Sequence, residues 1–156
     1  MTTSLKRAGT VLLSVLLCTL ALSAGAASKL RVGVKFWKTG SDKESMANSG
    51  IDTSREASLT RQSNGTYTLT LPIQQVSKMG VTGYLTGLTI GDVTYNGTVT
   101  GDVTKDTGVL TIKTLPASVL TGSDVNKALT VTCNIQMDLS LLGEINTSAR
   151  MCIWNK

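Results

Sequence analysis

The sequence predicts an all-β domain, and three observations carry this prediction. Threonine, valine, glycine, serine and leucine are abundant, apolar residues alternate with period two wherever they are periodic, and turn residues recur at short intervals. About eight short strands separated by such turns are typical of an immunoglobulin-like antiparallel β-sandwich. We therefore expect that sandwich, with one short helix at about residues 42–48.

The first half of the domain contains three expected strands. Residues 30–38 and 66–71 alternate between apolar and polar side chains, and residues 57–60 form a shorter run between them. Pro72 ends the third strand, because proline has no N–H to donate to a neighbouring strand. The polar stretch 39–52 lies between the first two strands and contains the expected helix.

The second half is punctuated by a strong turn signal. Asn96-Gly97 favours a type I′ hairpin, because both central positions of that turn need a positive φ. The segment 76–88 lacks the alternation of a strand. The strands expected here are residues 92–95, 98–100, 109–115, 128–137 and 149–154.

The N-terminus has the pattern of a secretory signal peptide. Lys6 and Arg7 precede an apolar run, residues 11–22, and small residues follow it. The apolar run is too short to span a bilayer comfortably. We expect residues 1–27 to be removed on export and residues 28–156 to be a single domain that is secreted or held at the cell surface, with no membrane span in the mature chain.

Composition excludes several classes of function. Removing Lys6 and Arg7 leaves 13 basic and 10 acidic residues, a net charge of about +3 that is too weak and scattered for nucleic-acid binding. The chain has no histidine, so the commonest general base and metal ligand are both missing. We expect a protein that is not an enzyme.

Two cysteines remain after the predicted cleavage. Cys133 and Cys152 lie on strands that are expected to be neighbours, in a chain bound for an oxidising space. A disulfide would close a loop of about 20 residues and stabilise the domain by roughly 3 kcal/mol. Two reduced, buried thiols are the alternative.

Four segments, in order, resemble one family. They are Val32-Gly33-Val34-Lys35-Phe36-Trp37-Lys38, residues 40–48 with their Lys-Glu-Ser-Met core, residues 64–71, and Met79-Gly80-Val81-Thr82-Gly83-Tyr84-Leu85. Together they resemble a NEAT (near-iron-transporter) domain. Such domains are β-sandwiches on exported proteins of Gram-positive bacteria, and many bind haem and relay it along the cell wall.

The resemblance implies a haem site at the short helix. By position, Ser45 would hydrogen-bond a propionate, Met46 would pack on the porphyrin face, and Lys43 or Lys38 would face the propionate charge. A hydroxyl and helix N–H groups suit a carboxylate, and a thioether adapts to an aromatic plate. The alternative is that Ser45 caps the helix and Met46 fills the core.

The chain departs from the family where the iron ligand should be. Haem-binding members carry a tyrosine near the start of the penultimate strand, and residues 121–129 contain no tyrosine, histidine or methionine. The tyrosines of this chain, Tyr67, Tyr84 and Tyr95, do not match that motif. The resemblance therefore implies haem binding with an atypical or absent iron ligand, and the sequence leaves the ligand atom unknown.

The expected function is that of a secreted haem-binding or haem-relay module, with haem or a haem-carrying protein as its partner. The alternative is a surface protein-interaction or adhesion module on the same sandwich. Exposed Trp37 and Trp154 would favour that alternative, because aromatic anchors concentrate interface energy.

Overall fold

Nine antiparallel strands make up one continuous sheet in the computed structural model, which describes residues 27–78, 80–138 and 143–156. Three short 3-10 helices, η1 to η3, lie in the connections. The strands are β1 (Ser28–Trp37), β2 (Ala57–Arg61), β3 (Tyr67–Pro72), β4 (Val76–Lys78), β5 (Val81–Ile90), β6 (Val93–Thr100), β7 (Val109–Leu115), β8 (Leu129–Met137) and β9 (Glu144–Asn155). The 3-10 helices are η1 (Met46–Gly50), η2 (Ala117–Val119) and η3 (Val125–Lys127).

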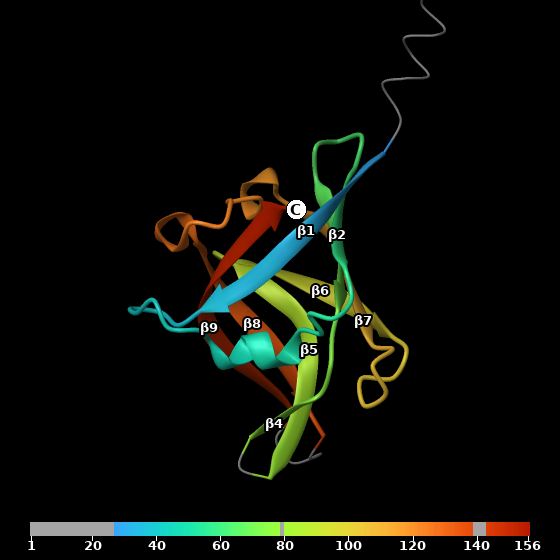
Figure 1. Ribbon diagram of the computed structural model, residues 1–156, viewed down its shortest axis with the longest axis vertical. Helices are drawn as coiled ribbons and strands as arrows, with labels where there is room; N and C mark the ends of the chain where they lie inside the picture. Colours follow the sequence, from blue (N-terminus) through green and yellow to red (C-terminus); the bar gives the residue numbers. More distant parts are fainter. Residues whose placement is uncertain (1–26, 79, 139–142) are drawn as a thin grey trace, which may run out of the picture.

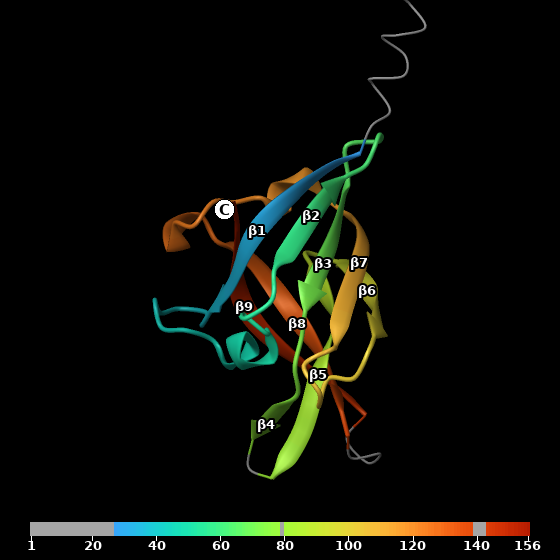
Figure 2. The ribbon, with the colours of Figure 1, turned by 45° about the vertical axis from the view of Figure 1, so that its right-hand side comes forward.

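The sheet closes on itself. Its order is β4-β5-β6-β7-β3-β2-β1-β9-β8, and β5 also pairs with β8, so eight strands form an antiparallel barrel with β4 added at one side (Figures 1 and 2). The all-β class is confirmed. The expected division into two separate sheets is not seen, because β5 joins β6 to β8 and leaves no gap between sheets.

Most of the closing strand β5 lies in the segment 76–88, which the sequence did not identify as strand. Two glycines obscure its alternation, and both are required by close packing. A Cβ on Gly83 would lie 2.7 Å from the Gln136 carbonyl oxygen, and one on Gly87 would lie 2.6 Å from that of Tyr95. A β-bulge between Leu85 and Gly87 shifts the register as well.

Asn96-Gly97 was expected to form a turn, and this prediction is wrong. Both residues lie within β6, and the reversal occurs earlier, at Gly91 with φ of +59°. Gly97 faces the neighbouring strand β7, where a Cβ would lie 2.3 Å from the Leu110 side chain. The glycine is therefore needed for close packing and not for a positive φ.

The short strand β4 was not expected either, since it lies in the same segment 76–88. The remaining strands agree with the sequence to within one or two residues, except that β9 begins at Glu144, five residues earlier than expected. The expected helix at 42–48 is a 3-10 helix shifted to Met46–Gly50. It starts later because Glu44 still pairs with Trp37 in a β-bridge, and Ser45 donates its N–H to the Phe36 carbonyl.

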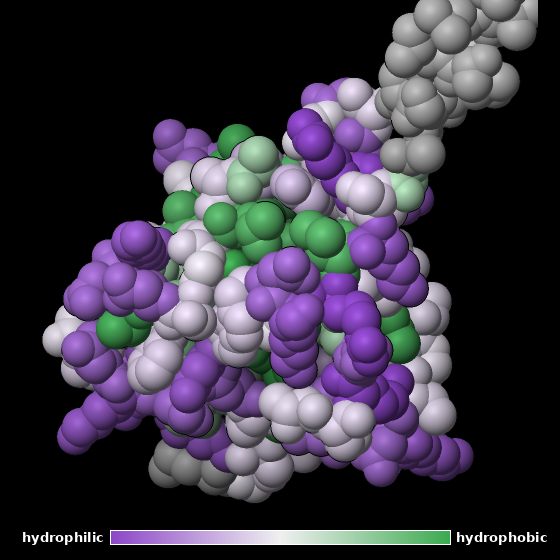
Figure 3. All heavy atoms as spheres, turned by 45° about the horizontal axis from the view of Figure 1, so that its top comes forward, coloured by the Kyte–Doolittle hydropathy of each residue, from purple (hydrophilic) through white to green (hydrophobic). Residues whose placement is uncertain are grey.

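The two ends of the barrel differ. Residues 116–128, including η2 and η3, fold over the end that is uppermost in Figure 1, and there Leu115 and Val119 are fully buried. We call this the closed end. Figure 3, turned to bring that end forward, shows hydrophobic residues gathered in one area among hydrophilic ones. The other end, beside η1 and β4, is the open end. Over the described residues, the large hydrophobic side chains that are exposed are Met46 (43%), Ile145 (39%) and Val93 (52%).

The expected disulfide is absent, and both cysteines are free and buried. Leu129 pairs with Met151 and Cys133 with Thr147, so Cys133 and Cys152 lie five rungs apart along the β8–β9 pair. That is about 16 Å at roughly 3.3 Å per residue. Cys133 also belongs to the core, whereas the Cys152 sulfur points outside the wall to the Asp124 carbonyl oxygen, 3.5 Å away. A bridge needs Cα atoms within about 7 Å.

The predicted signal peptide falls almost entirely on residues 1–26, outside the described residues. Throughout the part of the chain that is described, none of the helices has the length and apolarity needed to cross a membrane.

Candidate functional site

An apolar pocket of about 320 Å³ opens at the open end of the barrel. Its walls come from the inward-facing positions of β5, β8 and β9, and η1 and β4 lie at its mouth. Two of the three exposed hydrophobic residues, Met46 and Ile145, belong to it. We call it the Met46 pocket. Its lining residues are Met46, Ala47, Val76, Lys78, Val81, Gly83, Leu85, Ile135, Met137, Ile145 and Thr147.

Side-chain hydrogen bonds fix η1, and with it Met46. The Ser45 hydroxyl accepts from the Ala47 N–H at 3.3 Å and so caps the helix. The Asn48 amide accepts from the Phe36 N–H and donates to the Phe36 carbonyl, both at 2.7 Å. One amide side chain thus pairs with β1 as a neighbouring strand would, and holds η1 against the barrel.

The connection from η1 to β2 is fastened by a nearly buried carboxylate. Asp52 accepts from the Ser54 hydroxyl at 2.5 Å and from Arg55 Nε at 2.6 Å. Arg55 in turn donates to the Gly108 carbonyl at 2.6 Å. The hydrogen bonds from Ser54 and Arg55 lower the pKa of Asp52 below its ordinary value. The carboxylate therefore stays charged, and this side of the open end is held in place.

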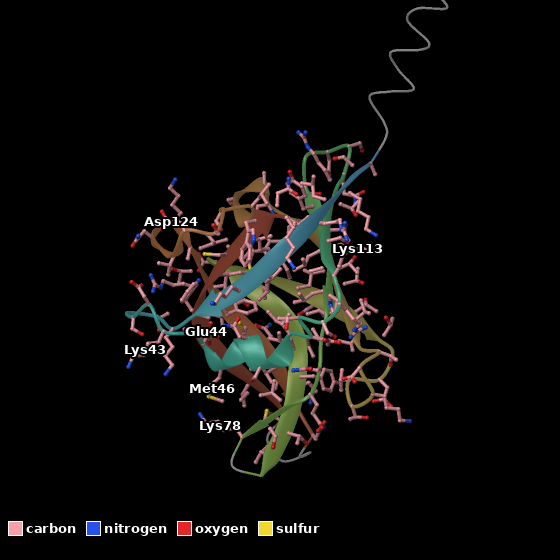
Figure 4. The ribbon with its side chains drawn as sticks, viewed as in Figure 1. Lys43, Glu44, Met46, Lys78, Lys113 and Asp124 are labelled. Atoms are coloured by element: carbon pink, nitrogen blue, oxygen red, sulfur yellow. The ribbon has the colours of Figure 1, made fainter. Side chains whose placement is uncertain are left out.

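Lys78 is the cationic residue of the Met46 pocket. It ends β4, is exposed, and lines the same pocket as Met46, and Figure 4 labels both at the lower left of the barrel. An apolar cavity with a single ammonium group at its rim suits an apolar molecule that carries an anionic group, because the ring or chain leaves water while the charges stay near the surface.

The three residues that the sequence proposed for haem do not share one site. Met46 lines the Met46 pocket and is exposed, so it does not fill the core. Ser45 is buried, caps η1 and lines a different cavity. Lys43 is exposed in the loop beyond β1, and Figure 4 shows it at the tip of that loop, apart from Met46.

The cavity that Ser45 lines is larger, about 570 Å³, and lies on the outside of β1. Four of its charged residues are paired with each other, Lys35 with Glu44 at 2.5 Å and Arg55 with Asp52, and Lys156 lines it as well. We regard the smaller Met46 pocket as the better candidate, because its walls are almost wholly apolar and expose hydrophobic groups that would gain from being covered.

The other aromatic candidates lie elsewhere. Tyr67, Tyr84 and Tyr95 are partly buried against the core and do not line the Met46 pocket. Trp37 and Trp154 are half-buried. The Lys35 ammonium lies 4.5 Å from the Trp37 ring centre, and Trp154 packs on Gly33, where a Cβ would meet the ring at 2.2 Å. Neither tryptophan is an exposed anchor of the kind that the interaction-module alternative requires.

The segment expected to carry an iron ligand, residues 121–129, lies at the closed end, where Thr121 and Gly122 bond to the backbone of Ile153. It is separated from Met137 by most of β8, roughly 25 Å at about 3.3 Å per residue. The Met46 pocket therefore does not coincide with the place where the family motif would put a tyrosine.

A porphyrin needs apolar walls for its ring, cations for its carboxylates and, if it holds iron, a ligand atom. The Met46 pocket offers the walls, Lys78 for a carboxylate, and the thioethers of Met46 and Met137 as soft donors. Among the described residues, no cluster of three histidine, cysteine or acidic side chains is suited to a metal ion. These residues fit the ring of haem better than its iron.

Of the lining residues, only Met46 was identified as a site residue from the sequence, and those missed include Ile135, Met137 and Ile145. The alternation of β8 marks Ile135 and Met137 as sharing one face, but periodicity does not reveal that this face continues beyond the core to a pocket. The signal that was missed is position: Ile135 and Met137 lie near the end of β8, which pairs with β5, and Ile145 lies opposite Ile135 on β9. The strand β5 itself was not expected.

No family model matches this chain, and no curated protein is significantly similar to it. The resemblance to NEAT domains therefore remains a prediction from the sequence.

Proposed function

We propose that this protein is an exported binding module that takes up an apolar ligand bearing an anionic group in the Met46 pocket, and that the ligand is a porphyrin such as haem. One observation carries the proposal: exposed Met46 and Ile145 flank the opening of an apolar cavity that has Lys78 at its rim. Exposed apolar side chains that line a cavity commonly mark a ligand-binding site.

The volume limits how the ligand is seated. A cavity of about 320 Å³ is at the small end of ligand sites, so it admits one side of a porphyrin ring and leaves the rest outside. The ring contacts Met46 and Ile145, and a carboxylate faces Lys78. Haem would bring an iron centre, but the affinity comes mainly from burial of the ring, since neither tyrosine nor histidine lines the pocket.

The test is a titration of the purified protein with haemin and with metal-free protoporphyrin, followed by absorbance and tryptophan fluorescence. We expect similar affinities for the two, and Met46→Ala should weaken both by about fivefold through lost contact area. A haemin affinity far above that of protoporphyrin would instead mean that the iron has a strong ligand.

Two matched pairs locate the site. Lys78→Glu should weaken binding of either porphyrin by about fivefold, whereas Lys113→Glu should not, because Lys113 is also exposed but lies outside the pocket. Ile145→Asp should also weaken it, whereas Val93→Asp should not, because Val93 is exposed but does not line the pocket. Equal effects within each pair, or no binding to the unaltered protein, would contradict the proposal.

A further inference from the structure

We propose that Met46 is a site of reversible oxidation to methionine sulfoxide, and that this modification releases the ligand from the Met46 pocket. The inference rests on the proposed function for its consequence, but the modification itself is argued from exposure alone. It assigns to one side chain both the contact with the ligand and the control of that contact.

The methionines of the described chain differ sharply in access to solvent. Met46 is 43% exposed, Met137 is partly buried, and Met151 is fully buried in the core. Oxidation of methionine follows exposure, because the oxidant must reach the sulfur. Among these three residues, Met46 is therefore oxidised first and Met151 last.

The chemistry needs an oxidant of the peroxide class. A lone pair on the Met46 sulfur attacks one oxygen of hydrogen peroxide, and the O–O bond breaks. Proton transfer then gives methionine sulfoxide and one molecule of water. The sulfur loses two electrons, and the peroxide is reduced. Methionine sulfoxide reductases return the sulfoxide to the thioether with two electrons from a thiol reductant, and the oxygen leaves as water.

The position of Met46 makes the modification consequential. Met46 lines the pocket together with apolar residues such as Val76 and Val81, and a sulfoxide places a strong hydrogen-bond acceptor there. Lys78 lines the same pocket, so its ammonium gains an acceptor that competes with the carboxylate of the ligand. Both effects weaken binding.

The sequence allows each methionine to be read separately. Cleavage after lysine and arginine places Met46 in residues 44–55, Met79 in 79–105, Met137 in 128–150 and Met151 in 151–156. Mass spectrometry after graded peroxide treatment therefore gives four independent oxidation curves. We expect residues 44–55 to gain one oxygen at lower peroxide than residues 128–150 and 151–156.

Binding of metal-free protoporphyrin is then measured before and after peroxide. We expect oxidation to weaken binding about tenfold, and a sulfoxide reductase to restore it. For Met46→Leu, whatever its starting affinity, peroxide should leave the affinity unchanged, whereas Met137→Leu should lose affinity on oxidation as the unaltered protein does.

The outcomes separate this inference from the proposed function. The oxidation switch is overturned if the protein binds equally well before and after oxidation. It is also overturned if Met46→Leu loses as much affinity on peroxide treatment as the unaltered protein. In both cases the proposed ligand site in the Met46 pocket is still supported. Oxidation of Met46 later than Met151 also overturns the switch alone. No binding before oxidation overturns both.

Discussion

The two ends of the barrel use the same kind of element for opposite purposes. At the closed end, η2 places Val119 in the core with no exposed surface, whereas at the open end η1 leaves Met46 43% exposed. Both are short 3-10 helices in connections between strands. The difference lies in what they cover: η2 completes the core at the closed end, whereas η1 leaves apolar surface uncovered at the open end, as the proposed ligand site requires.

The largest test of this comparison is a pair of truncations to alanine. Leu115→Ala, at the closed end, should lower the free energy of unfolding by about 3 kcal/mol, because it opens a cavity in a close-packed core. Ile145→Ala, at the open end, should cost less than about 1 kcal/mol, since its side chain is already 39% exposed. Chemical denaturation measures both. Equal losses would mean that the open end is part of the core.

The second test concerns the attachment of η1. Asn48→Ala should cost about 2 kcal/mol, because the N–H and carbonyl of Phe36 each lose a partly buried hydrogen bond. It should also weaken porphyrin binding, since η1 carries Met46. The control is Asn126→Ala, whose exposed side chain bonds only to Asp124 and whose loss should change stability by less than about 0.5 kcal/mol. Similar values would argue against the strand-like role of Asn48.

The third test is pH dependence. Because the folded pKa of Asp52 lies below its ordinary value near 3.8, its contribution is fully present above that value and is lost as the pH falls through the folded pKa. Asp52→Asn should therefore lower stability at neutral pH and flatten its decline below about pH 4. Acid denaturation of both proteins measures this effect. Asp102→Asn should change the profile less, because hydrogen bonds from Thr104 also lower the pKa of Asp102 but its side chain is 43% exposed, against 7% for Asp52.

The smallest expected effect is in thiol labelling. Burial raises the pKa of Cys133 to about 12, so that thiol should react only when the barrel unfolds. Cys152 lies outside the wall beneath the residues around Asp124, and opening of that loop alone should expose it. Alkylation at low denaturant, read on residues 128–150 and 151–156, should therefore modify Cys152 first. Modification of Cys133 first would mean that the loop over Cys152 at the closed end is more rigid than the core around Cys133.

Most of the strands could be predicted because alternation and turn residues report on half-buried β structure. The closure of the barrel could not be predicted, because it depends on β5. In that strand a side chain at Gly83 would collide with β8, and one at Gly87 would collide with β6. A glycine that permits close approach and one that permits a turn look alike in sequence, which also explains the misplaced hairpin at Gly97.

The candidate site was predictable only in part. Met46 could be singled out because it follows a polar loop and resembles a known motif, and it does line a pocket. Ser45 and Lys43 are its neighbours in sequence, but the capped start of η1 turns them away from that pocket. Apart from Ala47, the other lining residues come from four strands, and their convergence depends on a register that no local pattern reveals.

Closure of the barrel also affects how this domain behaves at high concentration. Along the described chain, every strand but β4 has a hydrogen-bonded neighbour on each side. The β4 edge is three residues long and ends in Lys78, and short, charged edges resist strand-to-strand association between molecules. The lysine that we assign to the ligand thus also guards against aggregation, so replacing it with an apolar residue should make the protein less soluble as well as weaker in binding.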